Sequence, residues 1–242
     1  MSRLMSLLLA VLTVVAVVAI RAPAAWLGDA LAARTKLRLI DARGTVWQGS
    51  ALIGVSNGRE TTLLPGRLEW TVTGLRAGRA WARLTHAWLD QPLALGLGAG
   101  ALSLEKGAAR LPAATLAAAG APFNTLRPGG VLELRWTDAE LAGGALDGEL
   151  QVDWRDAQSA LSPIVPLGSY RLRVAGRAGP PSLELQTLAG PLEMRGSGKI
   201  EGSHIRFRGV AAAERDMQPA LNGLLGLLGM RSGDKVLLAI DT

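Results

Sequence analysis

Residues 132–136 read Leu-Glu-Leu-Arg-Trp, and residues 150–155 read Leu-Gln-Val-Asp-Trp-Arg. In both stretches apolar and polar side chains alternate with a period of two, which is typical of a β-strand with one buried and one solvated face. The glycine pair Gly143-Gly144 lies between them, where a tight turn would reverse the chain. The sequence therefore predicts neighbouring strands of an antiparallel sheet that is covered on one side.

The same alternation recurs along most of the chain. Further stretches that show it are residues 68–73, 170–174, 183–185, 192–194 and 205–208, and residues 236–240 are expected to form the last strand. Turns are expected at Asn57-Gly58, Pro65-Gly66, Pro128-Gly129-Gly130, Gly143-Gly144, Gly179-Pro180-Pro181, Gly196-Ser197-Gly198 and Gly202-Ser203. A spacing of about a dozen residues between turns favours a meandering sheet. We expect a mainly β fold, with a large curved antiparallel sheet or an open-barrel-like body.

Three segments have helical character. Residues 26–34 are rich in Ala and Leu and follow the N-terminal segment, whereas residues 112–119 and 218–228 are expected as two short helices of the body. Leu221, Leu224, Leu225 and Leu228 recur at helical spacing in the last of these segments, and Gly229 ends it. We expect this helix to bury its apolar stripe against the sheet of its own chain.

The N-terminal segment Leu4–Ile20 is continuously apolar and lies between Arg3 and Arg21. Its 17 residues would extend ~26 Å as a helix, slightly less than a hydrocarbon core of ~30 Å. A retained membrane anchor, a signal peptide cleaved near Ala22-Pro23-Ala24, and a buried helix of a soluble protein are the three interpretations. We expect the anchor, with the N-terminus in the cytoplasm and the bulk of the chain outside it.

These features predict four parts of the chain. Residues 1–3 would form a short cytoplasmic tail, 4–21 a transmembrane anchor, and 22–43 a linker with a helix. Residues 44–242 would form a single β-rich periplasmic domain. The expected localisation is therefore the inner membrane, with a single pass.

Composition limits the possible chemistry. The 242-residue chain has a formal net charge of +6 and no cysteine, which excludes disulfides, zinc–thiolate sites and a cysteine nucleophile. Basic and acidic residues alternate on the strands, as in Glu133/Arg135, Asp153/Arg155 and Glu193/Arg195. This interleaving favours solvated strand faces, and we expect no nucleic-acid partner.

Catalytic motifs are absent from the sequence. His86 and His204 lack partners at metal-ligand spacing, and no H-E-x-x-H, G-x-S-x-G or Walker lysine occurs. We expect no enzyme activity, no cofactor, and no catalytic, cofactor-binding or metal-binding residues. The sequence does not identify binding residues.

Tryptophan is the commonest aromatic residue. Four tryptophans fall on the apolar side of their strands: Trp47, Trp70, Trp136 and Trp154. We expect them to pack in the core, and the alternative is that they line a groove for a partner strand or an acyl chain. Trp81 and Trp88 are placed less regularly and are expected at a rim, where an amphipathic ring suits a partner or a membrane surface.

Six short motifs follow one another behind the apolar segment. They are Gly-Thr-Val-Trp-Gln-Gly at 44–49, Leu-Pro-Ala at 111–113, Pro-Gly-Gly at 128–130, Pro-Leu-Gly-Ser-Tyr at 166–170, Leu-Ala-Gly-Pro-Leu at 188–192 and Leu-Leu-Gly-Leu-Leu-Gly at 224–229. In order and spacing the chain resembles protein N of the bacterial type II secretion system. The resemblance implies a bitopic inner-membrane protein with a β-rich periplasmic body, without a catalytic site or cofactor.

The resemblance also implies partners. Such a protein would be an accessory part of the machine that exports folded proteins through an outer-membrane secretin, and it would contact the secretin or the inner-membrane platform subunits. Exposed sheet edges could bind partner strands by β-augmentation. The alternative function is a periplasmic protein of the cell envelope whose curved sheet holds a lipid or another apolar ligand.

Overall fold

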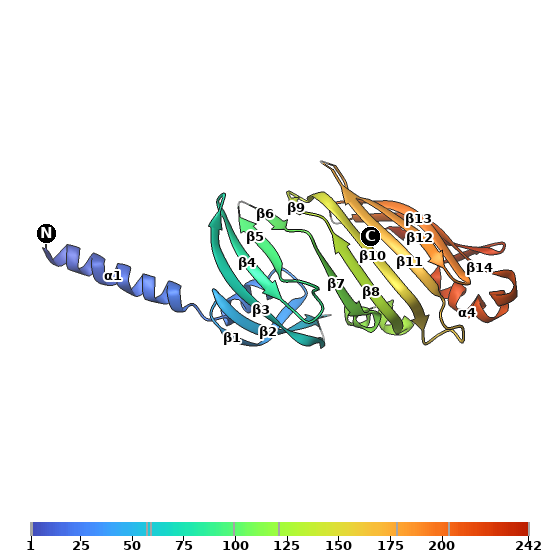
Figure 1. Ribbon diagram of the computed structural model, residues 1–242, viewed down its shortest axis with the longest axis horizontal. Helices are drawn as coiled ribbons and strands as arrows, with labels where there is room; N and C mark the ends of the chain where they lie inside the picture. The colour runs from blue at the N-terminus through green and yellow to red at the C-terminus, as the bar shows by residue number, and fades with distance from the viewer. Residues whose placement is uncertain are drawn as a thin grey trace.

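A computed structural model describes residues 2–56, 58, 60–98, 100–120, 122–177, 179–202 and 204–241 (Figure 1). Its helices are α1 (Ser2–Arg21), α2 (Ala25–Ala32), the 3-10 helix η1 (Ala113–Ala119), α3 (Phe123–Leu126), the 3-10 helix η2 (Arg215–Met217) and α4 (Gln218–Leu228). Its strands are β1 (Leu37–Gly44), β2 (Gln48–Ser56), β3 (Thr61–Arg76), β4 (Arg79–Thr85), β5 (Leu93–Gly98), β6 (Ala101–Leu104), β7 (Gly107–Pro112), β8 (Pro128–Trp136), β9 (Ala139–Ala142), β10 (Ala145–Ser159), β11 (Gly168–Gly176), β12 (Ser182–Ala189), β13 (Leu192–Glu201), β14 (His204–Ala213), β15 (Met230–Ser232) and β16 (Lys235–Asp241).

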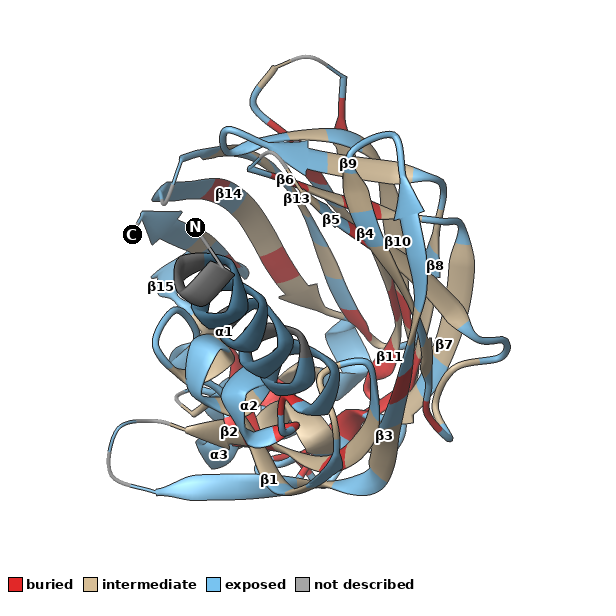
Figure 2. Cartoon of the chain, turned by 90° about the vertical axis from the view of Figure 1, so that its left-hand side faces the viewer, coloured by how far each residue is buried: buried red, intermediate tan, exposed pale blue. Residues whose placement is uncertain are grey.

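The strands form one large open antiparallel sheet, as the alternation predicted. Its order is β1-β2-β3-β4-β5-β6-β9-β10-β11-β12-β13-β14-β16-β15, and in addition β8 pairs with β10 and β7 with β8. The sheet is curved, and its two edges, β1 and β15, do not pair with each other (Figure 2). It is therefore a meander that stays open rather than closing into a barrel.

Two neighbouring lines of the sheet each consist of two short strands instead of one long strand, and the two interruptions lie side by side. One line consists of β6 and β7, separated by residues 105–106, and the next consists of β8 and β9, separated by residues 137–138. The long strand β10 joins the two halves, because its first part pairs with β9 and the rest pairs with β8. The Asp138 carboxylate accepts a hydrogen bond from the backbone N–H of Lys106 at 2.6 Å. This bond connects the two lines where both are interrupted.

The inner face of the sheet, defined as the face that carries α4, is apolar. Helix α4 buries its leucines in a cluster with residues of β13, β14 and β16; the buried members are Leu167, Leu192, Ala211, Leu221, Leu224, Leu225 and Val236. At the other end of the sheet, Ala24 beside α2 packs with Ala51 and Trp70. The prediction that helix 218–228 buries its stripe on its own sheet is confirmed.

Glycines inside the strands make room for aromatic rings. Gly49 is paired with Trp70, and Gly107 with Trp136. A Cβ atom on either glycine would lie 2.6 Å from the ring of its paired tryptophan. Each ring therefore lies across the neighbouring strand, where only a glycine leaves space.

Several expected turns are wrong, because their glycines belong to strands. Pro65-Gly66 lies within β3, Gly196-Ser197-Gly198 lies within β13, and Pro128-Gly129-Gly130 begins β8. Gly143-Gly144 does form a turn, between β9 and β10. The turns expected at Asn57 and Ser203 fall partly on residues outside the described ones.

We expect Gly49→Ala to lower the free energy of unfolding by about 1–3 kcal/mol, because the new methyl group would meet the Trp70 ring and the backbone oxygen of Arg43. Urea unfolding followed by tryptophan fluorescence measures the change. Gly223→Ala is the matched control: it lies in α4 with nothing within 4 Å of the added Cβ, and it should stabilise by about 0.5–1 kcal/mol. Equal effects of the two substitutions would contradict this explanation.

The N-terminal region forms two helices and then joins the sheet. The described apolar side chains of α1 are exposed, so the interpretation as a buried helix is wrong. None of the helices in the described part of the chain is both long and apolar enough to cross a membrane. Helix α2 lies within the expected helix 26–34 apart from its first residue, and residues 37–43 belong to β1.

Candidate functional site

The two histidines lie in different halves of the sheet. His86 follows β4, is buried, and accepts the backbone N–H of Trp88 on Nδ1 at 3.1 Å, whereas His204 begins β14. Among the residues that the structure describes, no group of three or more His, Cys, Asp or Glu side chains could hold a metal ion. The histidines therefore do not form a common site.

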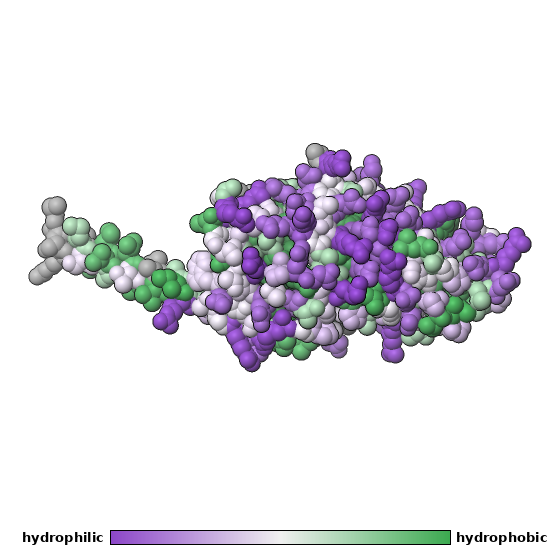
Figure 3. Space-filling model, viewed as in Figure 1, coloured by the Kyte–Doolittle hydropathy of each residue, from purple (hydrophilic) through white to green (hydrophobic). Residues whose placement is uncertain are grey.

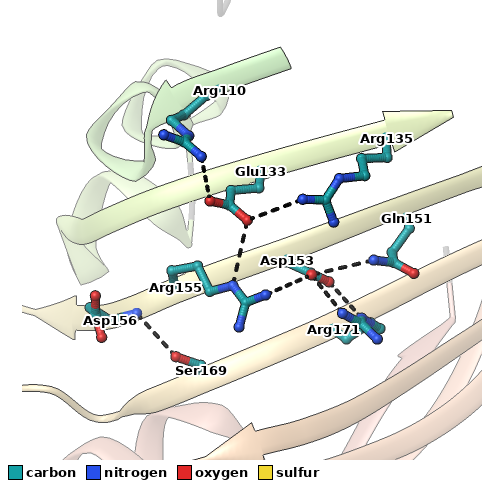
Figure 4. A network of polar contacts seen from close by, with 9 residues as sticks. All are labelled: Arg110, Glu133, Arg135, Gln151, Asp153, Arg155, Asp156, Ser169 and Arg171. Atoms are coloured by element: carbon teal, nitrogen blue, oxygen red, sulfur yellow. Dashed lines mark hydrogen bonds and ion pairs between the residues drawn. The ribbon is translucent and has the colours of Figure 1, made fainter. Parts of the chain in front are cut away.

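The outer face carries a polar network over β7, β8, β10 and β11 (Figure 4). We call it the arginine–carboxylate network; its members are Arg110, Glu133, Arg135, Gln151, Asp153, Arg155 and Arg171. Strand register brings them together, because Asp153 of β10 is paired with Glu133 of β8 and with Arg171 of β11. Two carboxylates side by side would repel each other, so the arginines are needed to hold them.

Asp153 is the centre of the network. Its side chain is 0% exposed, and Arg171 binds it with both ends of the guanidinium, Nε to Oδ1 at 2.7 Å and Nη2 to Oδ2 at 2.7 Å. Arg155 and Gln151 donate to Oδ2 at 3.2 and 3.3 Å. The expectation that Asp153 lies on a solvated strand face is therefore wrong, because neighbouring arginines cover it.

Arg171 also controls the protonation of Asp153. Its hydrogen bonds lower the pKa of the carboxyl group below the ordinary value of 3.8, although burial acts in the opposite direction. A carboxylate that is buried and bound by a bidentate arginine stays charged, since the charged form makes the stronger hydrogen bonds.

Glu133 connects Arg110 and Arg135 to Asp153 through Arg155. It accepts a hydrogen bond from Arg110 at 2.9 Å, and it forms ion pairs with Arg155 at 3.6 Å and Arg135 at 3.8 Å. Arg155 thus bridges the two carboxylates. The network holds four arginines against two carboxylates, and the hydrophilic surface over this part of the sheet is visible in Figure 3. The network therefore presents an excess of positive charge.

The stability contributed by Asp153 should depend on pH. Because its folded-state pKa is lowered, the contribution is present above the ordinary value of 3.8 and is lost as the pH falls from there through the lowered pKa. We expect the difference in unfolding free energy between the unchanged chain and Asp153→Asn to shrink over this range. Urea unfolding at a series of pH values measures it, and a difference that stays constant down to about pH 2 would contradict the assignment.

Three of the four tryptophans expected in the core pack on the inner side of the sheet. Trp70 is buried and donates through Nε1 to the backbone oxygen of Thr45 at 3.2 Å. Trp136 and Trp154 are half-buried, and their Nε1 atoms donate to the backbone oxygens of Glu105 at 2.9 Å and Gly129 at 2.8 Å. Their rings pack on their own sheet, and the prediction of core packing is confirmed for Trp70.

Trp47 is the exception. It lies in the turn between β1 and β2, is exposed, and donates through Nε1 to the backbone oxygen of Ala19 at 2.7 Å. The expectation of a core position is therefore wrong. The preceding Gly44-Thr45 indicates a turn, which is the signal that could have placed this ring outside the sheet.

Trp81 and Trp88 are half-buried. The Arg76 guanidinium lies 4.6 Å from the centre of the Trp81 ring, which is a cation–π contact on the outer face. The Trp88 and His86 rings pack in an edge-on arrangement with 4.6 Å between their centroids. Both tryptophans thus have contacts within the chain.

The two edges of the sheet differ in how well they are covered. Helix α2 packs beside β1, and the Arg38 side chain donates to the backbone oxygens of Ala32 and Thr35. At the other edge, β15 pairs with only the first half of β16. Residues 238–241 of β16 have a strand partner on one side only among the described residues, and Ile240, which is one of them, is exposed. Alternation alone cannot show which edge is open, because it does not give the strand order.

Comparison with known proteins agrees with this architecture. A family model described as type II secretion system (T2SS), protein N, matches residues 35–237, which include the whole sheet apart from the last residues of β16. No curated protein and no solved structure matches the chain. The family match gives no support to a lipid-binding groove. The chain belongs to the family of type II secretion system protein N.

Proposed function

We propose that this chain is a non-catalytic accessory component of the type II secretion machinery that contacts other secretion subunits through its sheet. The observation that carries this proposal is the family match over residues 35–237. Proteins of this family are structural or accessory components and not generally enzymes, and membership implies association with the cell envelope and with other secretion components. The arginine–carboxylate network adds a basic outer face to which an acidic subunit surface could bind.

The proposed location is the inner membrane, with the sheet in the periplasm and α1 as the anchor. Leu7, Leu8 and Leu9 follow one another around the helix and are 68%, 68% and 66% exposed, so no part of the sheet covers them. Exposed leucines around a helix are stable in lipid and unfavourable in water. The apolar part of α1 is short, and the proposal therefore includes local thinning of the bilayer around it.

The proposed contact with other subunits is β-augmentation at the free part of β16. An unpaired strand edge offers backbone donors and acceptors to another strand, and exposed apolar side chains nearby, such as Leu237 and Ile240, would add specificity. The β1 edge is less suitable because α2 and Arg38 cover it. The proposed partners are the secretin and the inner-membrane platform subunits.

A photo-crosslinking amino acid at Ala239 tests this contact in cells, and the same group at Leu37 on the covered β1 edge is the matched control. Both residues are exposed, so neither change should disturb the fold. We expect adducts with a secretion subunit from position 239 and much weaker ones from position 37. Adducts from position 37 alone would contradict the choice of edge, and the absence of secretion subunits from both would count against the function.

A further inference from the structure

The link between α1 and the sheet is a fixed joint. Helix α1 ends at Arg21, and the next residues are hydrogen-bonded to the turn between β1 and β2. The Val46 N–H donates to the Ala22 oxygen at 2.9 Å, and the Ala24 N–H donates to the Gly44 oxygen at 3.1 Å. Ala22 and Ala24 are both buried. A segment held in this way does not act as a flexible spacer.

Trp47 bonds the same turn directly to the helix. Its indole N–H donates to the backbone oxygen of Ala19, 28 residues earlier in the sequence, at 2.7 Å. Ala19 lies in the last turn of α1, where carbonyl groups have no partner within the helix. The sheet is therefore attached to α1 at residues 19–21, at the C-terminal end of the apolar segment.

Two large rings are exposed at this joint. Trp47 is 47% exposed, and Trp26, in the first turn of α2, is 52% exposed. The indole N–H of Trp47 is hydrogen-bonded to the helix, so the exposed part of this side chain is its apolar ring. Rings with an apolar body and a bonded polar tip are enriched at membrane–water interfaces, where the tryptophans of spanning proteins form belts.

We propose that Trp26 and Trp47 lie in the phospholipid headgroup layer beside Arg21 and hold the first strands of the sheet against the membrane surface. The surface formed by these exposed rings would thus contact the bilayer interface, because α1 continues from the joint with exposed apolar side chains. The inference rests on the proposed anchoring of α1. It adds that the sheet has a fixed membrane-proximal end, whereas α4 lies at the opposite end of the molecule (Figure 1).

Depth-dependent fluorescence quenching tests this placement. The chain has no cysteine, so Gln48→Cys or Leu227→Cys gives one labelled site each in the full chain, the first beside Trp47 and the second in α4. Both positions are exposed. Each variant is labelled with an environment-sensitive dye and reconstituted into phosphatidylcholine–phosphatidylglycerol vesicles that contain lipids with a nitroxide on the headgroup. We expect loss of fluorescence at position 48 and none at position 227.

A second measurement uses the native tryptophans and avoids the labels. Headgroup nitroxides should quench part of the tryptophan emission, and Trp47→Phe should remove a share of that quenchable part. Trp154→Phe, within the sheet, is the control and should leave the quenchable part unchanged. Carbonate extraction of the vesicles separates the two proposals. A membrane-bound chain that shows no quenching at position 48 and no effect of Trp47→Phe would overturn the inference alone, whereas release into the wash would overturn the anchor and the inference together.

Discussion

Asp153→Ala should lower the free energy of unfolding by about 3 kcal/mol, because it leaves Arg171 and Arg155 without the carboxylate that they bind. The Asp153 side chain is 0% exposed, whereas the side chains of Arg171 and Arg155 are 26% and 40% exposed, so water weakens part of the native interaction. Arg171 is partly exposed and would regain some hydration in the variant, which keeps the expected loss near the lower end of the range for buried pairs. Urea unfolding at neutral pH, followed by tryptophan fluorescence, measures it.

Glu149→Ala is the matched control for this substitution. Glu149 lies on the same strand, β10, and pairs with Arg173 at 3.2 Å, with both side chains exposed. Surface ion pairs of this kind contribute about 0–1 kcal/mol. A change in the Asp153→Ala variant that is no larger than the change in Glu149→Ala would show that the arginine–carboxylate network does not stabilise the sheet.

Leu221→Ala should have an effect of similar size, about 3–5 kcal/mol, at the other side of the sheet. Leu221 is 0% exposed and packs between α4 and the inner face. Removing its side-chain carbons leaves a cavity that the surrounding strands can only partly fill. The same urea unfolding experiment measures the loss.

Leu227→Ala in the same helix provides the comparison. Leu227 is 64% exposed, so this substitution should change the free energy of unfolding by no more than about 0.5 kcal/mol. Similar losses from both leucines would mean that α4 does not pack on the sheet through the face that contains Leu221. The comparison therefore tests the position of α4 independently of its helical structure.

The strands and α4 could be predicted because their signals are local. The alternation in residues 132–136 and 150–155 falls within β8 and β10, and the leucine spacing in 218–228 gives the bounds of α4. A side-chain period depends only on the element itself. The break between β6 and β7 could not be predicted, since it depends on contacts with distant residues, such as the hydrogen bond from the Lys106 N–H to Asp138 between β8 and β9.

The candidate site was less predictable for a related reason. Alternation places Asp153 on the polar face of β10, but its burial depends on arginines from neighbouring strands that meet over it. The glycines opposite Trp70 and Trp136 resemble turn residues in the sequence, because their role follows from strand register. Register is set by contacts between strands and is not contained in the pattern of one strand.

The most direct test of the secretion role is co-purification of the full chain, tagged at its C-terminus, from detergent-solubilised membranes after crosslinking in cells. We expect the outer-membrane secretin or an inner-membrane platform subunit to be recovered in amounts well above those obtained with an unrelated membrane protein that carries the same tag. Recovery of the chain without any secretion subunit, under conditions in which the assembled machine remains intact, would contradict the account.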